Sequence, residues 1–267
     1  MFKVKDGSTD YLTLNQSTGQ VNILKTLRIE NTTSSTTGVI FKGTARFIHN
    51  YQAPGTDGFN TFIGMNSGNF TMSGSSFLAS CNTSVGYESL SSLTDGNNNS
   101  AFGFSSLNMN TTGTNNSSFG GNTLLSNTTG YSNSVFGSSS MRLNTDGYDN
   151  SAFGVASLFN NTTGYQNCTF GNNSLFFNQT GTGNTAMGYQ TLFNNTSSSN
   201  SGFGSHALYF NTTGSYNSAF GLVSLYHNGS GNENCAFGVN SLFFNNSGNS
   251  NTAVGYQSLF TNNASNN

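Results

Sequence analysis

Carboxylates, imidazoles and thiols are the side chains of this sequence that could carry out acid–base, metal or nucleophilic chemistry. Asp146 and Asp149 are the one close pair of carboxylates in the array of repeats described below. Carbohydrate-cleaving enzymes use such pairs when the two groups lie roughly 5–9.5 Å apart. The pair stands in Thr-Asp-Gly-Tyr-Asp, however, which is typical of a turn. We therefore expect no catalytic residues and do not expect an enzyme.

The pattern of histidines, cysteines and glycines predicts neither a metal site nor a cofactor site. His49, His206 and His227 are far apart and have no Cys or carboxylate at ligand spacing. Cys168 and Cys235 hold the same repeat position four units apart, or about 19 Å at ~4.8 Å per strand layer, which is too far for a disulfide. We interpret both as small buried fillers. The glycine-rich stretches match neither a P-loop nor a dinucleotide fingerprint.

Composition excludes several other classes. Charged residues make up 6% of the 267 residues and the net charge is −2, so the clustered Lys and Arg that nucleic acid needs are missing. The 24 Phe and 11 Tyr supply more burial than a disordered chain carries. There is no apolar run of about 18 residues, so we expect no membrane insertion.

A glycine recurs through most of the chain at an interval of 17 residues. Two intervals differ: Gly64 and Gly86 are 22 residues apart, and Gly188 and Gly204 are 16 apart. Such a period is typical of coils stacked along one axis. The anchor glycines are Gly64, Gly86, Gly103, Gly120, Gly137, Gly154, Gly171, Gly188, Gly204, Gly221, Gly238 and Gly255.

Asparagine stands four residues before every anchor glycine. Stacked in register, such side chains can satisfy one another's amide groups from coil to coil, as they do in cross-β assemblies. We predict a structural ladder rather than glycan acceptors. Its members are Asn99, Asn116, Asn133, Asn150, Asn167, Asn184, Asn217, Asn234 and Asn251. Counting on by a full period from Asn251 places the next rung one residue beyond Asn267.

Apolar residues hold two further positions of the repeat, directly before the anchor and four residues after it. Because β side chains alternate faces, the Phe before the anchor points away from the Ala or Ser that precedes it. The Leu is followed by another aromatic residue, so both cannot face one core. The candidate core and interface residues are Phe102, Phe119, Phe136, Phe153, Phe170, Phe203, Phe220, Phe237, Leu158, Leu175, Leu192, Leu225 and Leu242.

These patterns predict an all-β chain, a parallel β-solenoid or β-roll of 17-residue coils in a fibrous, trimeric assembly. Ser-Ala-Phe-Gly is expected to be a strand, Ser-Leu-Phe-x-Asn a second short strand or extended turn, and Asn-x-Thr-Gly a turn. Eleven steps at ~4.8 Å give a rod of roughly 50–55 Å. A single coil would leave an apolar stripe in water, which parallel partner chains would cover.

We expect three regions. Residues 1–48 carry β-forming clusters at Phe2, Tyr11, Gln20 and Gly38 and form an N-terminal cap or attachment segment. Residues 49–59 are a connecting turn region, and residues 60–267 are the tandem repeats. The irregular intervals place extra residues in 70–81 and a deletion in 195–200, both between predicted strands, so the strands should stay in register.

Two units carry a resemblance to known proteins. Asn184-Thr-Ala-Met-Gly-Tyr-Gln-Thr-Leu-Phe and Asn251-Thr-Ala-Val-Gly-Tyr-Gln-Ser-Leu-Phe resemble repeats of bacteriophage and virus tail fibres. They are also similar to the head repeats of YadA-like trimeric adhesins, roughly Asn-Ser-Val-Ala-Ile-Gly, which are shorter. The resemblance covers about residues 59–267 and implies homotrimeric fibres with parallel β-rolls.

The expected function is that of a virion tail fibre, a stiff trimeric rod that contributes to host attachment. Its partners would be a host surface glycan or protein receptor, with other virion or fibre proteins at its ends. The alternative is a bacterial cell-surface trimeric adhesin or an extracellular filament. An adhesin should have a secretion signal, and the sequence from Met1 to Gly7 has no apolar core for one. An ice-binding solenoid would need a flat Thr array, whereas these threonines fall in loops.

Overall fold

The computed structural model describes residues 2–6, 9–15, 20–23 and 27–267. The chain divides into two compact units, Met1–Asn31 and Thr32–Asn267. The first unit contains an antiparallel sheet in the order β1-β2-β3, made of β1 (Phe2–Asp6), β2 (Thr9–Asn15) and β3 (Gln20–Ile23). Strands therefore form at the β-rich clusters near Phe2, Tyr11 and Gln20. Residues 24–26, which follow β3, lie outside the described residues.

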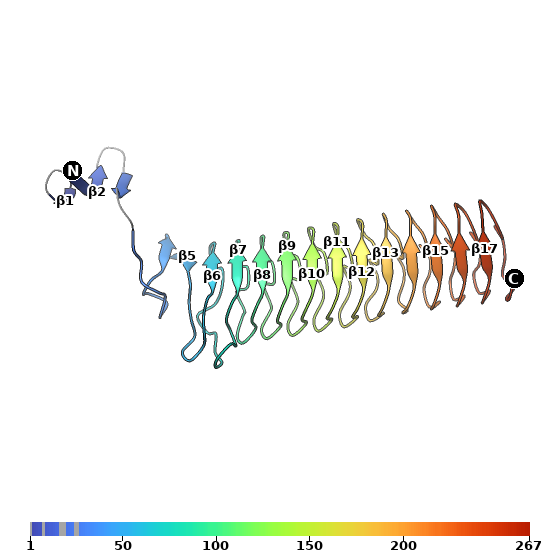
Figure 1. Cartoon of the computed structure of the whole chain (residues 1–267), viewed down its shortest axis with the longest axis horizontal. Helices are drawn as coiled ribbons and strands as arrows, with labels where there is room; N and C mark the ends of the chain where they lie inside the picture. The colour runs from blue at the N-terminus through green and yellow to red at the C-terminus, as the bar shows by residue number, and fades with distance from the viewer. Residues whose placement is uncertain (1, 7–8, 16–19, 24–26) are drawn as a thin grey trace. The chain divides into compact units, whose positions relative to one another are not determined.

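The second unit is a single 14-stranded sheet that begins with a hairpin and continues as coils (Figure 1). β4 (Ile40–Lys42) and β5 (Ala45–His49) pair antiparallel, and β5 pairs antiparallel with β6 (Thr61–Ile63). Residues 32–48 thus share a unit with the coils. The strands that follow are β7 (Thr83–Val85), β8 (Ser100–Phe102), β9 (Ser117–Phe119), β10 (Ser134–Phe136), β11 (Ser151–Phe153), β12 (Cys168–Phe170), β13 (Thr185–Met187), β14 (Ser201–Phe203), β15 (Ser218–Phe220), β16 (Cys235–Phe237) and β17 (Thr252–Val254).

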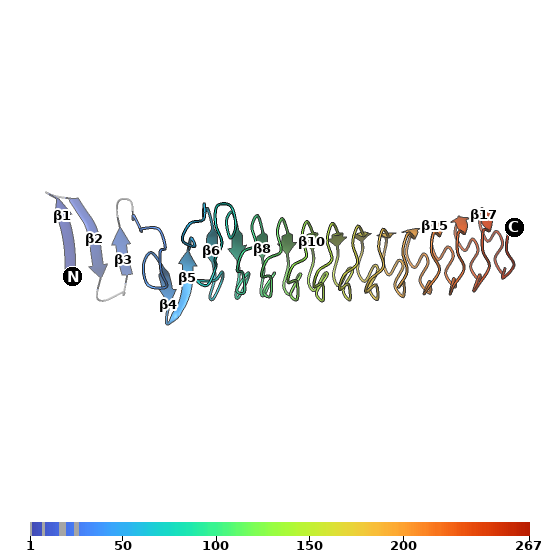
Figure 2. The ribbon, with the colours of Figure 1, turned by 90° about the horizontal axis from the view of Figure 1, so that it is seen from below.

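From β6 onward every strand pairs in parallel with the next, with equivalent residues side by side (Figure 2). Phe136, for example, pairs with Phe153. The predicted β-solenoid of 17-residue coils is therefore confirmed. Thr61 still pairs with Thr83 across the long interval, and Thr185 pairs with Ser201 across the short one. The insertion and the deletion are absorbed between strands, as expected.

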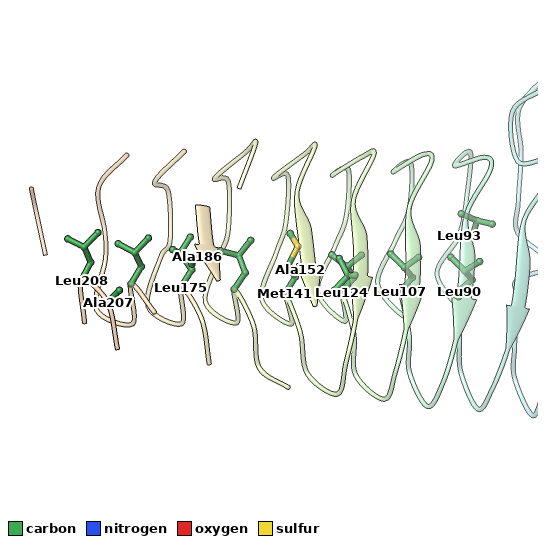
Figure 3. Packing of buried hydrophobic residues seen from close by; sticks show 14 of the residues in the cluster. Leu90, Leu93, Leu107, Leu124, Met141, Ala152, Leu175, Ala186, Ala207 and Leu208 are labelled. Atoms are coloured by element: carbon green, nitrogen blue, oxygen red, sulfur yellow. The ribbon is translucent and has the colours of Figure 1, made fainter. Parts of the chain in front are cut away.

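From β7 to β16 the interior of each coil is narrow and is filled by a small residue in the middle of the strand, such as Ala152 or Ser118, and by one large apolar side chain from the turn segment. The middle residue of the strand, such as Ala152, points inward and is fully buried, as is the leucine four residues after the glycine (Figure 3). A Cβ added to Gly202 would lie 2.6 Å from Thr191 Cγ2, which shows how closely the two sides approach. Full burial of one leucine contributes about 1.5–3 kcal/mol.

The sequence predicted either a second short strand or an extended turn after the anchor glycine. The structure has the extended turn. Isolated bridges join His227, Phe244 and Thr261 at its end in the last coils. In this segment Ala156 and Leu158 have φ values of 52° and 54°, and a left-handed conformation costs a non-glycine residue roughly 1–2 kcal/mol. Burial of Leu158 and the 2.9 Å hydrogen bond from its N–H to Ser174 O offset this cost.

Arg46 and His49 on β5 cover the first coil. The Arg46 guanidinium donates to the carbonyls of three consecutive residues, 66–68, and lies 5.2 Å from the Phe70 ring centroid. His49 is 3% exposed, and burial lowers its pKa to about 4, with a further lowering by Arg46 and an opposing effect of Ser67 O. The neutral ring donates from Nε2 to Ser67 O at 2.8 Å and accepts the Tyr51 N–H at Nδ1.

Candidate functional site

The buried asparagines four residues before the anchors form a continuous hydrogen-bonded ladder. Asn150 donates from its N–H and from Nδ2 to Asn133 Oδ1, both at 3.1 Å, and from Nδ2 to Gly164 O at 2.9 Å. Its own Oδ1 accepts from the N–H and Nδ2 of Asn167 at 3.0 and 3.1 Å. The same arrangement occurs at Asn99, Asn116, Asn133, Asn167, Asn217 and Asn234, and at Asn251 with Ala264 O in place of the glycine carbonyl. The amide therefore links three coils.

Two further positions vary this ladder. Asn184 keeps the pattern except that its Nδ2 donates to Ser197 O, within the short unit. Asn200 donates its N–H to Asn184 Oδ1 at 3.0 Å, while its Nδ2 turns to Asn195 Oδ1 and Gly214 O. The prediction that the next rung lies one residue beyond Asn267 is wrong. Asn267 occupies it and donates its N–H and Nδ2 to Asn251 Oδ1, both at 3.0 Å, because the last interval is also short.

A second ladder runs through the asparagines seven residues after the anchors, which sequence reasoning interpreted only as turn formers. Asn161 Nδ2 donates to Asn144 Oδ1 at 2.7 Å and to Gly164 O at 3.0 Å. The recurrent spacing of this Asn with a Gly three residues later was the available signal. The members that donate to the preceding rung are Asn127, Asn144, Asn161, Asn178, Asn195, Asn211, Asn228 and Asn245.

The phenylalanines before the anchors lie on the outer side of their strands, which we call the strand-side column. They are half-buried or exposed, and Phe170 is 41% exposed. Successive rings stack with centroids 4.5–4.9 Å apart and planes within 7° of parallel. The candidate core and interface residues therefore fall into two groups. Leu158, Leu175, Leu192, Leu225 and Leu242 are in the core. Phe102, Phe119, Phe136, Phe153, Phe170, Phe203, Phe220 and Phe237 face outward.

A second set of aromatic residues follows the buried leucines, and we call it the turn-side column. Rings five residues after the anchor stack at 5.1–5.4 Å, from Phe159 through Phe176, Phe193, Tyr209, Tyr226 and Phe243 to Phe260. Phe177, Phe210, His227 and Phe244, one residue further on, meet these rings edge-on. Burial lowers the pKa of His227, which stacks between Phe210 and Phe244.

The two columns lie on different sides of the coil. Ser106, in the turn segment, donates across the interior to Ser118 Oγ in the middle of β9, at 2.8 Å. The strand and the turn segment therefore both line the interior. Phe159 and Phe153 are half-buried, beside the fully buried Leu158 and Ala152, so each ring lies outside the shared interior.

The polar candidates do not assemble into a reactive site. Asp146 accepts from Thr129 Oγ1 at 2.5 Å and from Thr128 Oγ1 at 3.3 Å, and exposed Asp149 has a φ of 54°. This is the geometry of a turn. Within the described ranges, no group of three or more His, Cys, Asp or Glu side chains could hold a metal ion. That same part of the chain has no helix long and apolar enough to cross a membrane.

The cysteines were predicted to be buried fillers, and this prediction is wrong. Cys168 and Cys235 are unpaired and half-buried at the first residue of β12 and β16. Residues two apart on a strand share a face, so Cys168 lies beside Phe170 on the outer side. Partial burial raises the pKa of its thiol.

No protein-family model, curated protein or solved structure matches this sequence. The resemblance to fibre repeats therefore rests on the repeat motifs themselves.

Proposed function

We propose that this chain is a structural fibre protein of a virion, a stiff homotrimeric rod that contributes to host attachment. The observation that carries the proposal is the pair of outer aromatic columns on a coil whose interior is already complete. Two asparagine ladders and the buried leucines satisfy the inside of each coil. The half-exposed rings outside contribute nothing to that interior, and apolar surface of this length is typical of an interface.

Stiffness follows from the same contacts. Each asparagine of the first ladder bonds to the coils on both sides, so bending the axis would break buried hydrogen bonds on one side of the rod. A spacer of this kind can hold an attachment site away from a particle. Its exposed turns, with side chains such as Tyr131 and Tyr216, offer polar and aromatic contacts to a host glycan or surface protein.

Two experiments test the proposal. Size-exclusion chromatography with multi-angle light scattering on the purified chain should give three times the mass of 28.2 kDa, and a stable monomer would contradict the rod assembly. Immunogold labelling should decorate projecting fibres of virus particles. Label confined to bacterial cell envelopes would instead support the cell-surface adhesin or an extracellular filament.

A further inference from the structure

The occupant of the aromatic columns must share their axial spacing. Rings of the strand-side column stack every 4.5–4.9 Å, one per coil, with Met187 in place of a ring between Phe170 and Phe203. A partner that touches ring after ring needs the same repeat over many coils. A second copy of this chain meets that condition by identity, because its coils repeat with the same rise.

Charge also favours a second copy over a charged partner. The strand-side column and the aromatic part of the turn-side column contain no Lys, Arg, Asp or Glu. The rings of each column stack face to face, so within a column they present their edges to solvent. A surface of ring edges and aliphatic side chains can pack closely against a second apolar surface of the same kind.

We infer that two different faces of the coil meet, with the strand-side column of one copy packed against the turn-side column of the next. This inference rests on the proposed fibre. Pairing of two strand-side columns about a two-fold axis would leave Phe177, Phe210 and Phe244 in water, each 40% or more exposed. A closed ring of head-to-tail contacts covers both columns of every chain. The contact spans the coils from Phe159 to Phe260, where the turn-side column is aromatic.

The native cysteine Cys168 provides a reporter on the strand side. In a background with Cys81→Ser and Cys235→Ser, one turn-side cysteine is added as Asn160→Cys or Asn194→Cys, both at half-buried positions six residues after an anchor. Each pair is treated with a short bis-maleimide at mildly alkaline pH, because burial raises the pKa of the Cys168 thiol. Two positions are used because the register between copies sets which coil faces Cys168.

At least one two-cysteine variant should give covalent dimers and trimers on a denaturing gel, with no larger product. Cys168 alone, and each turn-side cysteine with Cys168→Ser, should stay monomeric on the gel. Thr163→Cys, at an exposed position outside both columns, combined with Cys168 sets the background. Equal crosslinking by Cys168 alone would overturn the pairing of unlike faces, and so would no crosslinking above background in a multimeric protein.

The two proposals fail in different ways. A chain that is monomeric by light scattering and crosslinks in no variant contradicts the fibre itself. A multimer that crosslinks through Cys168 alone contradicts only the pairing of unlike faces and leaves the fibre standing.

Discussion

Replacing Asn150 with alanine tests whether the first ladder holds the coils together. The substitution removes one of the two side-chain donors to Gly164 O and the acceptor of the Asn167 N–H, and Asn133 Oδ1 loses one of its donors. All of these groups are buried. An unsatisfied buried group costs about 1–3 kcal/mol. The Asn167 N–H is left without its acceptor, whereas Gly164 O keeps the Asn161 donor. The orphaned N–H and the lost amide bonds should therefore lower the free energy of unfolding by roughly 2–4 kcal/mol.

The loss should be local along the axis. In a stack of repeats each unit contacts only its neighbours, so stability is close to a sum of nearest-neighbour terms. We expect hydrogen exchange, followed by mass spectrometry, to show lost protection in the coils around β10, β11 and β12 and little change near β6 or β16. Urea unfolding followed by circular dichroism should give the free-energy difference, with a broader or split transition.

Asn172→Ala is the matched control. Asn172 is exposed, and its Oδ1 accepts the Val155 N–H at 3.1 Å, at the surface. Water can replace that bond, so the control should change stability by no more than about 1 kcal/mol. If Asn150→Ala and Asn172→Ala destabilise the protein equally, the ladder does not hold the coils together and the reasoning is refuted.

Three further predictions concern the core, the N-terminal cover and modification. Leu158→Ala should cost about 2–5 kcal/mol by urea unfolding, whereas the half-exposed Leu222→Ala should cost far less; similar losses would contradict the assigned core. His49, whose folded pKa of about 4 lies below its ordinary value near 6.5, should add stability above pH 6.5 that is lost as pH falls toward 4, up to roughly 3 kcal/mol. His49→Gln should flatten that part of the stability–pH profile, and an unchanged slope would show that another group titrates. Asn161 lies in an Asn-Thr-Thr acceptor sequence but is fully buried, so an oligosaccharyltransferase should leave Asn161 unmodified in the folded protein. Exposed Asn172, in Asn-Asn-Ser, should accept a glycan under the same conditions. Peptide mass mapping reads the two sites separately, and a glycan on Asn161 of the folded protein would contradict its burial.

The repeat made most of the fold predictable because one coil determines all the others. The strand Ser-Ala-Phe and its parallel register follow from alternation and period alone. The conformation of the turn segment did not follow, because sequence gives no reason to place Leu158 at a φ of 54°. That conformation is imposed by closing a narrow coil around a buried side chain.

The outward-facing residues were also predictable only in part. Sequence indicated that Leu158 and Phe159 could not share one core, and the structure places the first inside and the second outside. It did not indicate that Asn161 forms a second ladder, because an Asn before a Gly is ordinarily a turn former. Nor did it place Cys168 outside, because the period alone allows either face of the strand to point into the coil.

The two irregular intervals have a consequence for any side-by-side packing of copies. A surface that repeats every coil fits an identical surface nearly as well after sliding by one coil, so uniform repeats alone leave the axial alignment ambiguous. The long loop between β6 and β7 and the short one between β13 and β14 occur once each among the paired strands. The two loops therefore fix the axial alignment, because only one alignment places the long loops of all chains at one height and their short loops at another.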